Sequence, residues 1–237
     1  MVPNLPLKPE LLRQTELFAG LTDTDLQTIQ QAATVRQVER DGFFFYQGDP
    51  AEQVLALTEG RVRLAQVTPD GQQVILNLIS AGALFGIIAA IKATDYPVSA
   101  QAMEDSTALT WSREAMMGLV GRFPLLGMNI MRLMAEHVQE TQNRLRELTT
   151  ERVERRLART LLRLAAQTGV KTPEGVEIGL ALTRQDLAEM IGATLYTVSR
   201  ILSQWEAQGL VRSGRERVMI RFPHGLVSIA EDLPQRE

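Results

Sequence analysis

The chain has 237 residues and a formal net charge of −3 at pH 7, with 45% hydrophobic and 22% charged residues. These values are ordinary for a folded protein of one large or two modest domains, and they do not indicate an intrinsically disordered chain. Because the chain has no cysteine, disulfides, thiolate zinc sites and cysteine-ligated iron–sulfur clusters are excluded within it.

The N-terminal residues lack the basic and apolar segments of a signal peptide, and no apolar run is long enough to span a membrane. We therefore expect a cytoplasmic protein with no membrane partner. A net negative charge also argues against a protein that coats DNA through its bulk charge, so any DNA binding has to be local.

The N-terminal half changes pattern once. Residues from about 8 to 31 have the periodicity of two short helices. From about Thr34 to Arg113, short β-prone runs alternate with turn residues, and Pro69-Asp70-Gly71 is a strong hairpin signal. Many strands at this spacing indicate a β-sandwich or β-barrel. We assign residues 1–113 to one domain of N-terminal helices and a β-barrel.

A helical period follows from Ser112 to Leu148, with Pro124 in an early turn. Residues at alternating spacings of about three and four form a predicted seam, which consists of Phe123, Ile130, Met134, His137, Thr141, Leu145 and Leu148. Such a seam predicts a homodimer through residues about 123–148, related by a twofold axis. For part of this face, the alternative is packing against the β domain of the same chain. We assign residues 114–150 to a dimerisation helix and a hinge.

The remaining residues, 151–237, form a third predicted region. It opens with a helix from Arg152 to Gln167 that Gly169 ends. A short strand pair near Gly175–Leu182 follows, and residues beyond Pro223 are expected to form an appended helix or tail. We expect four arginines of the first helix to form a solvated face; they are Arg152, Arg155, Arg156 and Arg159.

Two short helices joined at a glycine are predicted between Leu182 and Leu210. Thr183 and Asp186 have capping-box spacing, so the first helix should run from about Arg184 to Ile191 before Gly192 ends it. The second helix should start near Leu195. One stripe of this helix is apolar, and the other carries Tyr196, Ser199, Arg200 and Ser203. This is the pattern of a helix-turn-helix, whose second helix lies in the DNA major groove. Any two amphipathic helices joined at a glycine remain the alternative.

A predicted hairpin after these helices favours the DNA-binding interpretation. Two strands flank a polar turn with Arg212, Arg215 and Arg217, as in a winged helix. Between Glu151 and Arg221, twelve Lys or Arg residues face eight Asp or Glu residues, a local balance of +4. The residues that we expect at double-stranded DNA are Thr183, Arg184, Thr194, Leu195, Tyr196, Thr197, Ser199, Arg200, Ser203, Arg215 and Arg217.

Four segments resemble the Crp/Fnr superfamily of bacterial transcription regulators, in that family's order. They are Phe45-Tyr46-Gln47-Gly48-Asp49-Pro50-Ala51-Glu52, Glu59-Gly60-Arg61-Val62, Gly82-Ala83-Leu84-Phe85-Gly86 and Thr194-Leu195-Tyr196-Thr197-Val198-Ser199-Arg200. The resemblance covers nearly the whole chain. It implies an α+β fold with an N-terminal cyclic-nucleotide-binding-like β-barrel of jelly-roll type, a long dimerisation helix and a C-terminal winged helix-turn-helix. It further implies a near-palindromic operator, contact with RNA polymerase, and a signal that is sensed in the barrel.

The chain departs from the family's cyclic-nucleotide binders at two places. Ile87 stands where they carry a glutamate for the ribose hydroxyl, and Tyr96-Pro97 stands where they carry Arg-Ser or Arg-Thr for the cyclic phosphate. Neither position retains the required acceptor or donor. We therefore expect no binding of cyclic AMP or cyclic GMP in the usual way. By resemblance, the effector pocket would be lined by Leu84, Phe85, Gly86, Ile87, Tyr96, Ser99 and His137.

Some likeness to nitrogen-oxide-responsive members of the family raises haem as a cofactor. Only His137 and His224 could supply an imidazole ligand, and His137, in the predicted dimer helix, is the better placed. A purely structural histidine is the alternative. A protein whose barrel senses nothing, and which is controlled by its abundance, is the alternative function.

An enzyme is not expected, because the sequence has no phosphate-binding loop of the Walker type and no convincing catalytic triad.

The chain also departs from the family's pattern at one residue of the predicted DNA-reading helix. Many family members carry a glutamate that accepts from a cytosine amine in the first turn of the reading helix, whereas this chain has Tyr196. The operator is therefore expected to differ at that base.

Overall fold

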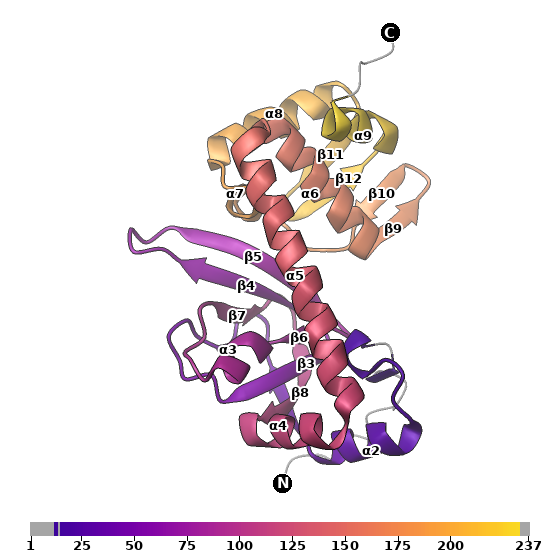
Figure 1. Cartoon of the computed structure of the whole chain (residues 1–237). Helices are drawn as coiled ribbons and strands as arrows, with labels where there is room; N and C mark the ends of the chain where they lie inside the picture. Colours follow the sequence, from indigo (N-terminus) through magenta and orange to yellow (C-terminus); the bar gives the residue numbers. More distant parts are fainter. Residues whose placement is uncertain (1–11, 14, 233–237) are drawn as a thin grey trace. The chain divides into compact units, whose positions relative to one another are not determined.

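The protein is described by a computed structural model that covers residues 12–13 and 15–232 (Figure 1). Its elements form two units, which divide between Glu140 and Thr141. The first predicted N-terminal helix lies largely outside the described residues, although Leu12 and Arg13 are helical. The second is α2 (Asp23–Gln31), which follows a short 3-10 helix, η1 (Glu16–Phe18).

Two four-stranded antiparallel sheets make up most of the first unit. Its elements after α2 are β1 (Thr34–Val38), β2 (Phe43–Phe45), β3 (Gln53–Glu59), β4 (Arg61–Val67), β5 (Gln73–Ser80), β6 (Leu84–Phe85), α3 (Ile87–Lys92), β7 (Ser99–Ala102), β8 (Ser106–Ser112) and α4 (Arg113–Arg122). The strand orders are β1-β8-β3-β6 and β2-β7-β4-β5. Strands of both sheets contribute to one apolar core that includes Phe44, Leu57, Val62 and Phe85. The predicted jelly-roll type is confirmed, but as two facing sheets rather than a closed barrel.

A second core lies between the sheet that contains β8 and the surrounding helices. Trp111 of β8 is fully buried in it and donates from Nε1 to the carbonyl of Ile29 in α2, at 2.8 Å. Asn129, also buried, donates to the carbonyls of Leu17 and Ala19 at 2.8 and 2.9 Å. These bonds satisfy polar groups that would otherwise be costly to bury, and they fix the N-terminal segment to the helices.

The helical region predicted from Ser112 to Leu148 consists of two helices. Ser112 caps α4 by accepting from the amide of Ala115 at 3.1 Å, and α5 (Pro124–Thr150) begins at the proline. Phe123 separates them with φ −119° and ψ 85°, because a residue before proline is disfavoured in helical conformation. Proline is well suited to the first position of the next helix, where its missing N–H has no helical partner.

The predicted seam of α5 is wrong at Ile130, which is buried, whereas Phe123 and Met134 are partly buried. Phe123, Ile130 and Met134 pack against the core of the first unit, and Ile130 is only 7% exposed. The apolar residues that α5 exposes include Met131, Val138, Leu145 and Leu148. Met131, Val138 and Leu145 are seven residues apart, so they form the repeat of a coiled-coil position. The alternative of packing against the β domain therefore holds for the face that contains Ile130.

The second unit contains the rest of α5 and the C-terminal elements. These are α6 (Val153–Thr168), β9 (Gly169–Thr172), β10 (Gly175–Ile178), α7 (Arg184–Ile191), α8 (Leu195–Ala207), β11 (Val211–Gly214), β12 (Arg217–Ile220) and α9 (Pro223–Glu231). The four strands form one antiparallel sheet in the order β11-β12-β10-β9. The predicted hairpin and appended helix are confirmed. The strand pair that was predicted near Gly175–Leu182 lies earlier in the chain, because β10 ends at Ile178 and pairs with β9, which starts at Gly169. Among the helices of the described residues, none is both long and apolar enough to cross a membrane.

Candidate nucleic-acid interface

The first helix of the predicted motif begins and ends as its sequence indicates. Thr183 accepts from the amide of Asp186 at 3.0 Å, and the Asp186 carboxylate accepts from the amide and hydroxyl of Thr183 at 2.8 and 2.6 Å. Gly192 ends α7 in the left-handed conformation, with φ 62° and ψ 47°. The chain can therefore turn sharply into α8 without the steric cost that a side chain would add there.

The second helix, α8, has one buried and one exposed face. Thr194 caps it by accepting from the amide of Thr197 at 3.2 Å. Its buried stripe consists of Val198, Ile201, Leu202 and Trp205. On the opposite side, Arg200 and Ser203 are exposed and Ser199 is half-buried. The arrangement leaves the polar face free for a ligand, as recognition in a major groove requires.

Two large apolar side chains are exposed at the first turn of α8. Tyr196 is 77% exposed and Leu195 is 47% exposed. Exposed apolar groups at this position can contact thymine methyl groups, and a phenol can also donate a hydrogen bond. The departure at Tyr196 therefore lies on the face that the motif presents.

The β11–β12 hairpin is the predicted wing. A two-residue turn of Arg215 and Glu216 joins its strands, and Glu216 has the left-handed φ of 61°. The carbonyl of Glu216 accepts from the amide of Leu182 at 3.2 Å, which links the turn to the segment before α7. Arg215 and Arg217 are exposed, whereas Arg212 pairs with Glu174 at 3.2 Å. Arg215 and Arg217 are therefore the cations of the wing best placed to meet a phosphate.

One predicted DNA contact is engaged within the unit. Arg184 donates from Nη2 to the hydroxyl of Ser213 in the wing at 2.9 Å, and the same nitrogen lies 3.6 Å from a carboxylate oxygen of Glu206 in α8. Sequence reasoning did not identify Glu206 or Ser213. No local spacing rule relates residues 29 positions apart, so only the fold brings Arg184 to Ser213.

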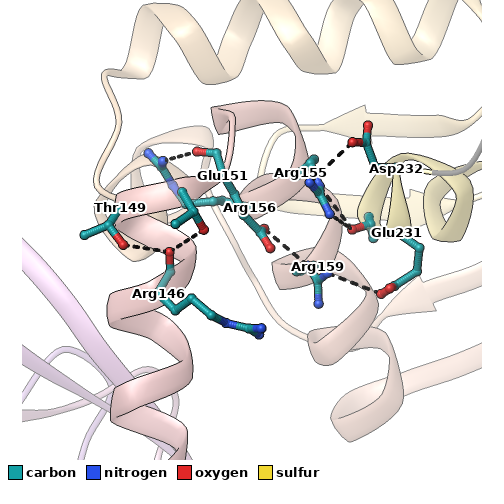
Figure 2. Close-up of polar contacts among 10 residues, drawn as sticks. Arg146, Thr149, Glu151, Arg155, Arg156, Arg159, Glu231 and Asp232 are labelled. Carbon is teal, nitrogen blue, oxygen red and sulfur yellow. Dashed lines mark hydrogen bonds and ion pairs between the residues drawn. The ribbon is translucent and has the colours of Figure 1, made fainter.

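Three of the four arginines that were predicted to form a solvated face make internal contacts instead (Figure 2). Arg155 lies 3.6 Å from the carboxylate of Asp232, and Arg159 lies 3.3 Å from that of Glu151 and 3.4 Å from that of Glu231. Of the four, Arg152 alone is exposed, at the start of α6. That prediction is therefore wrong for the other three, because the hinge and α9 supply partners that the sequence pattern of one helix cannot reveal.

Arg156 joins two backbone segments. Its Nη1 donates to the carbonyl of Glu151 at 2.9 Å, and its Nε donates to the carbonyl of Ile191, the last residue of α7, at 3.1 Å. The hinge at 149–151 stays a prediction. These residues lie at the end of α5 and just after it, where Thr149 and Thr150 donate their hydroxyls to the carbonyl of Arg146 (Figure 2). The basic charge of α6 thus serves the internal order of the second unit.

The residues predicted for an effector pocket lie in the first unit and are largely occupied with packing. Tyr96 stacks on Phe45 with ring centroids 3.7 Å apart, and its hydroxyl donates to the carbonyl of Gln53 at 2.7 Å. Burial raises the pKa of the Tyr96 phenol, so the group stays a donor at physiological pH. Phe85 lies in the same core, and Gly86, with φ 79°, passes close to the Tyr96 ring.

The other predicted pocket residues are dispersed. Ile87, which begins α3, is 7% exposed and belongs to the second core, against which Leu84 also packs. Ser99 accepts from the amide of Gln47 at 2.9 Å. His137 is exposed on α5, and His224 is exposed in the first turn of α9. A surface pocket of about 450 Å³ in this unit lies elsewhere, between residues 50–53, 93–95 and 112–114.

These features define a class: a winged helix-turn-helix protein with an N-terminal domain of the cyclic-nucleotide-binding type. Comparison with known proteins agrees. Residues 155–229 match the model of the Crp-like helix-turn-helix domain, and residues 35–123 match that of the cyclic nucleotide-binding domain. The Cyclic AMP receptor protein of Thermus thermophilus is 30% identical over 92% of this chain and 98% of its own. The chain therefore belongs to the Crp/Fnr family of DNA-binding transcription regulators.

Two further matches have lower sequence identity. The CRP-like cAMP-activated global transcriptional regulator of Mycobacterium tuberculosis is 23% identical over 89% of this chain and 94% of its own. The solved structure of FixK2 from Bradyrhizobium japonicum has a TM-score of 0.73 at 23% identity, covering 86% of this chain and 98% of that one. At this identity the likeness shows a shared fold. The relatives whose names state an activity are regulators rather than enzymes.

Proposed function

We propose that the protein is a cytoplasmic homodimeric regulator that binds a near-palindromic operator through α8 and the β11–β12 wing. The observation that carries this proposal is the division of α8 into a buried apolar stripe and an exposed face with Tyr196 and Arg200. Arg200 would make the bidentate contact to guanine that its fork of donors favours. Arg215 and Arg217 would meet phosphates, which position the protein without specifying a sequence. By family membership, RNA polymerase is the further partner.

The homodimer would form along α5. Met131, Val138 and Leu145 are exposed apolar residues at a spacing of seven, and each is more than half exposed in the single chain. Exposed apolar residues at this period are the usual seam of a two-stranded coiled coil. A twofold pair of reading heads would then match two operator half-sites.

We further propose that a signal other than cyclic AMP or cyclic GMP acts in the first unit. The Thermus thermophilus relative is named for cyclic AMP, yet this chain has Ile87 and Tyr96-Pro97 at the two anchoring positions. The buried Ile87 side chain offers no acceptor to a ribose hydroxyl, and the Tyr96 hydroxyl is already bonded to Gln53. Haem ligation by His137 stays a prediction. An absorbance spectrum with and without added haemin tests it.

The stacked Tyr96 and Phe45 favour a second candidate function, in which the first unit binds no effector and the regulator is controlled by its abundance. Dialysis separates the two candidates. If operator affinity in a cell extract changes on dialysis and returns with the removed small molecules, a signal acts. If the affinity is unchanged throughout, the constitutive regulator is favoured.

Selection of bound sequences from a random DNA pool, followed by sequencing, tests the proposed function. We expect an enriched motif of two inverted half-sites, since a C2 dimer presents two equivalent reading helices. An enriched motif without symmetry would contradict the dimer, and absence of any enrichment would contradict sequence-specific binding.

A further inference from the structure

Three side chains from different elements meet at the base of the wing. Glu206 is in the last turn of α8, Ser213 is in β11, and Arg184 opens α7. One carboxylate oxygen of Glu206 accepts from the amide of Ser213 at 2.6 Å and from its hydroxyl at 2.7 Å. The Ser213 hydroxyl in turn accepts from Arg184 at 2.9 Å, and the second Glu206 oxygen lies 3.6 Å from the same guanidinium nitrogen. We call these residues the wing triad.

The position of Ser213 gives the triad a mechanical role. β11 is the edge strand of its sheet, so an amide that points away from β12 has no strand to pair with. Glu206 supplies that missing acceptor and thereby ties the strand to the end of the reading helix. Ser213 is two residues from Arg215 at the wing turn, and in the ladder it pairs with Val218. Fixing Ser213 therefore fixes the turn that carries Arg215.

The charge of Glu206 makes this role testable. A carboxylate near a DNA-binding surface repels phosphates, so charge alone predicts that its removal strengthens binding. If Glu206 positions the wing, its removal should instead weaken DNA binding. The side chains of Glu206 and Arg184 are 30% and 34% exposed, so solvent screens their attraction only in part.

We propose that Glu206 is a positioning residue for the wing: with Ser213 and Arg184 it holds the β11–β12 turn where Arg215 can reach the phosphate backbone. The proposal rests on the proposed function, because it concerns the same DNA interface. It also assigns Arg184 a role within the protein in place of a direct phosphate contact.

A double-mutant cycle on the selected operator tests the proposal in the full-length protein. The variants are Glu206→Ala, Arg215→Ala and the two combined. We expect Arg215→Ala alone to weaken binding about fivefold and to lower the salt slope by about 1, the loss of one phosphate contact. Glu206→Ala should give a similar loss. In the Glu206→Ala background, Arg215→Ala should then cost less than about twofold, because the misplaced wing has already lost its contact.

Glu189→Ala is the matched control. Glu189 is a half-buried carboxylate of the same motif, and it accepts from Gln185 at 2.8 Å within α7. Its removal changes the charge equally without touching the wing, so operator affinity should stay unchanged or rise slightly. Amide hydrogen exchange of residues 211–220 without DNA should quicken in Glu206→Ala and not in Glu189→Ala. Should Glu206→Ala fail to fold, Ser213→Ala and Glu206→Gln carry the same comparison.

Several results would overturn the inference. One is an equal cost of Arg215→Ala in both backgrounds; another is tighter binding by Glu206→Ala, which would mean that Arg184 had been released to bind a phosphate. If Arg215→Ala binds the operator as the parent does, Arg215 makes no phosphate contact and the inference is wrong. The proposed contact of Arg200 with a base would not be affected by that result. If the parent itself enriches no sequence, the proposed function fails first.

Discussion

Tyr196 is the residue at which the operator should differ most from those of the family. It is 77% exposed in the first turn of α8, where the resemblance places a glutamate in many members. A carboxylate accepts from the cytosine amine, whereas a phenol offers a donor and an apolar ring. We expect Tyr196→Glu to shift the selected base at one position of each half-site toward cytosine. Selection with Tyr196→Phe is the control, and the same motif from all three proteins would contradict this contact.

Arg200 should carry base discrimination. It is exposed on the polar face of α8, and its fork of donors fits the two acceptors of guanine. Arg200→Ala should lose about 1 to 3 kcal/mol of preference for the operator over a variant in which that guanine is replaced. Competition binding with the two duplexes measures the difference. Ser203→Ala, one turn further along the same face, should leave that preference largely intact.

Thr183 should matter for stability more than its exposure implies. Its hydroxyl and amide both bond to Asp186, which is 8% exposed. Thr183→Ala removes the cap of α7 and deprives a buried carboxylate of one donor, which should cost about 1 kcal/mol of unfolding free energy. Urea unfolding measures the loss, and Thr183→Ser, which keeps the hydroxyl, should recover most of it. An unchanged midpoint in Thr183→Ala would show that the cap contributes nothing.

At the scale of elements, the exposed repeat on α5 predicts the oligomeric state. Val138→Glu places a charge on the proposed seam, where pairing would bury it without a partner. We expect this variant to sediment as a monomer and to lose high-affinity operator binding. Gln139→Glu introduces the same group one residue away and off the seam, and it should remain a dimer. If Val138→Glu still sediments as a dimer, the interface lies elsewhere.

The elements that sequence predicted well are those with local signals. The bounds of α7 and the start of α8 follow from caps and a glycine, which act within four residues. Which face of α5 is exposed depends instead on tertiary packing, which no local signal reveals. Ile130 and Met131 are adjacent apolar residues, and only the core of the first unit decides that Ile130 is buried while Met131 is exposed. The internal partners of the α6 arginines are unpredictable for the same reason, since Glu231 lies more than seventy residues from Arg159 in the sequence.

For the whole molecule, charge is divided unevenly. The chain is at −3, although residues 151–221 carry twelve basic and eight acidic residues. Arg155, Arg159 and Arg212 are paired with acidic residues of the same unit, which reduces the charge that is available for bulk attraction to DNA. Specific contacts must therefore supply most of the preference for one DNA sequence over another.

The order of domains was predictable from the spacing of the strands and the order of the motifs. The separation of the β domain into two sheets was not predictable from strand spacing, because that spacing is the same for a sandwich and a barrel.

Cyclic AMP should not bind in the manner of the family's cyclic-nucleotide receptors. Ile87 and Tyr96 both contribute to cores, so a ribose and a cyclic phosphate would find neither acceptor nor cation at these positions. Calorimetric titration should show no micromolar binding of cyclic AMP or cyclic GMP. A parallel titration with operator DNA is the positive control, since it shows that the protein is folded. Micromolar binding of either nucleotide would contradict this prediction.

The guanidinium of Arg156 holds carbonyls on both sides of α6 in the chain, those of Glu151 and Ile191. These two bonds join the segment just after α5 to the end of α7 through a single side chain. The next residue is Gly192, whose left-handed conformation is the softest joint before the reading helix. Loss of the Arg156 side chain would therefore remove a bond at the residue just before the turn that leads into α8.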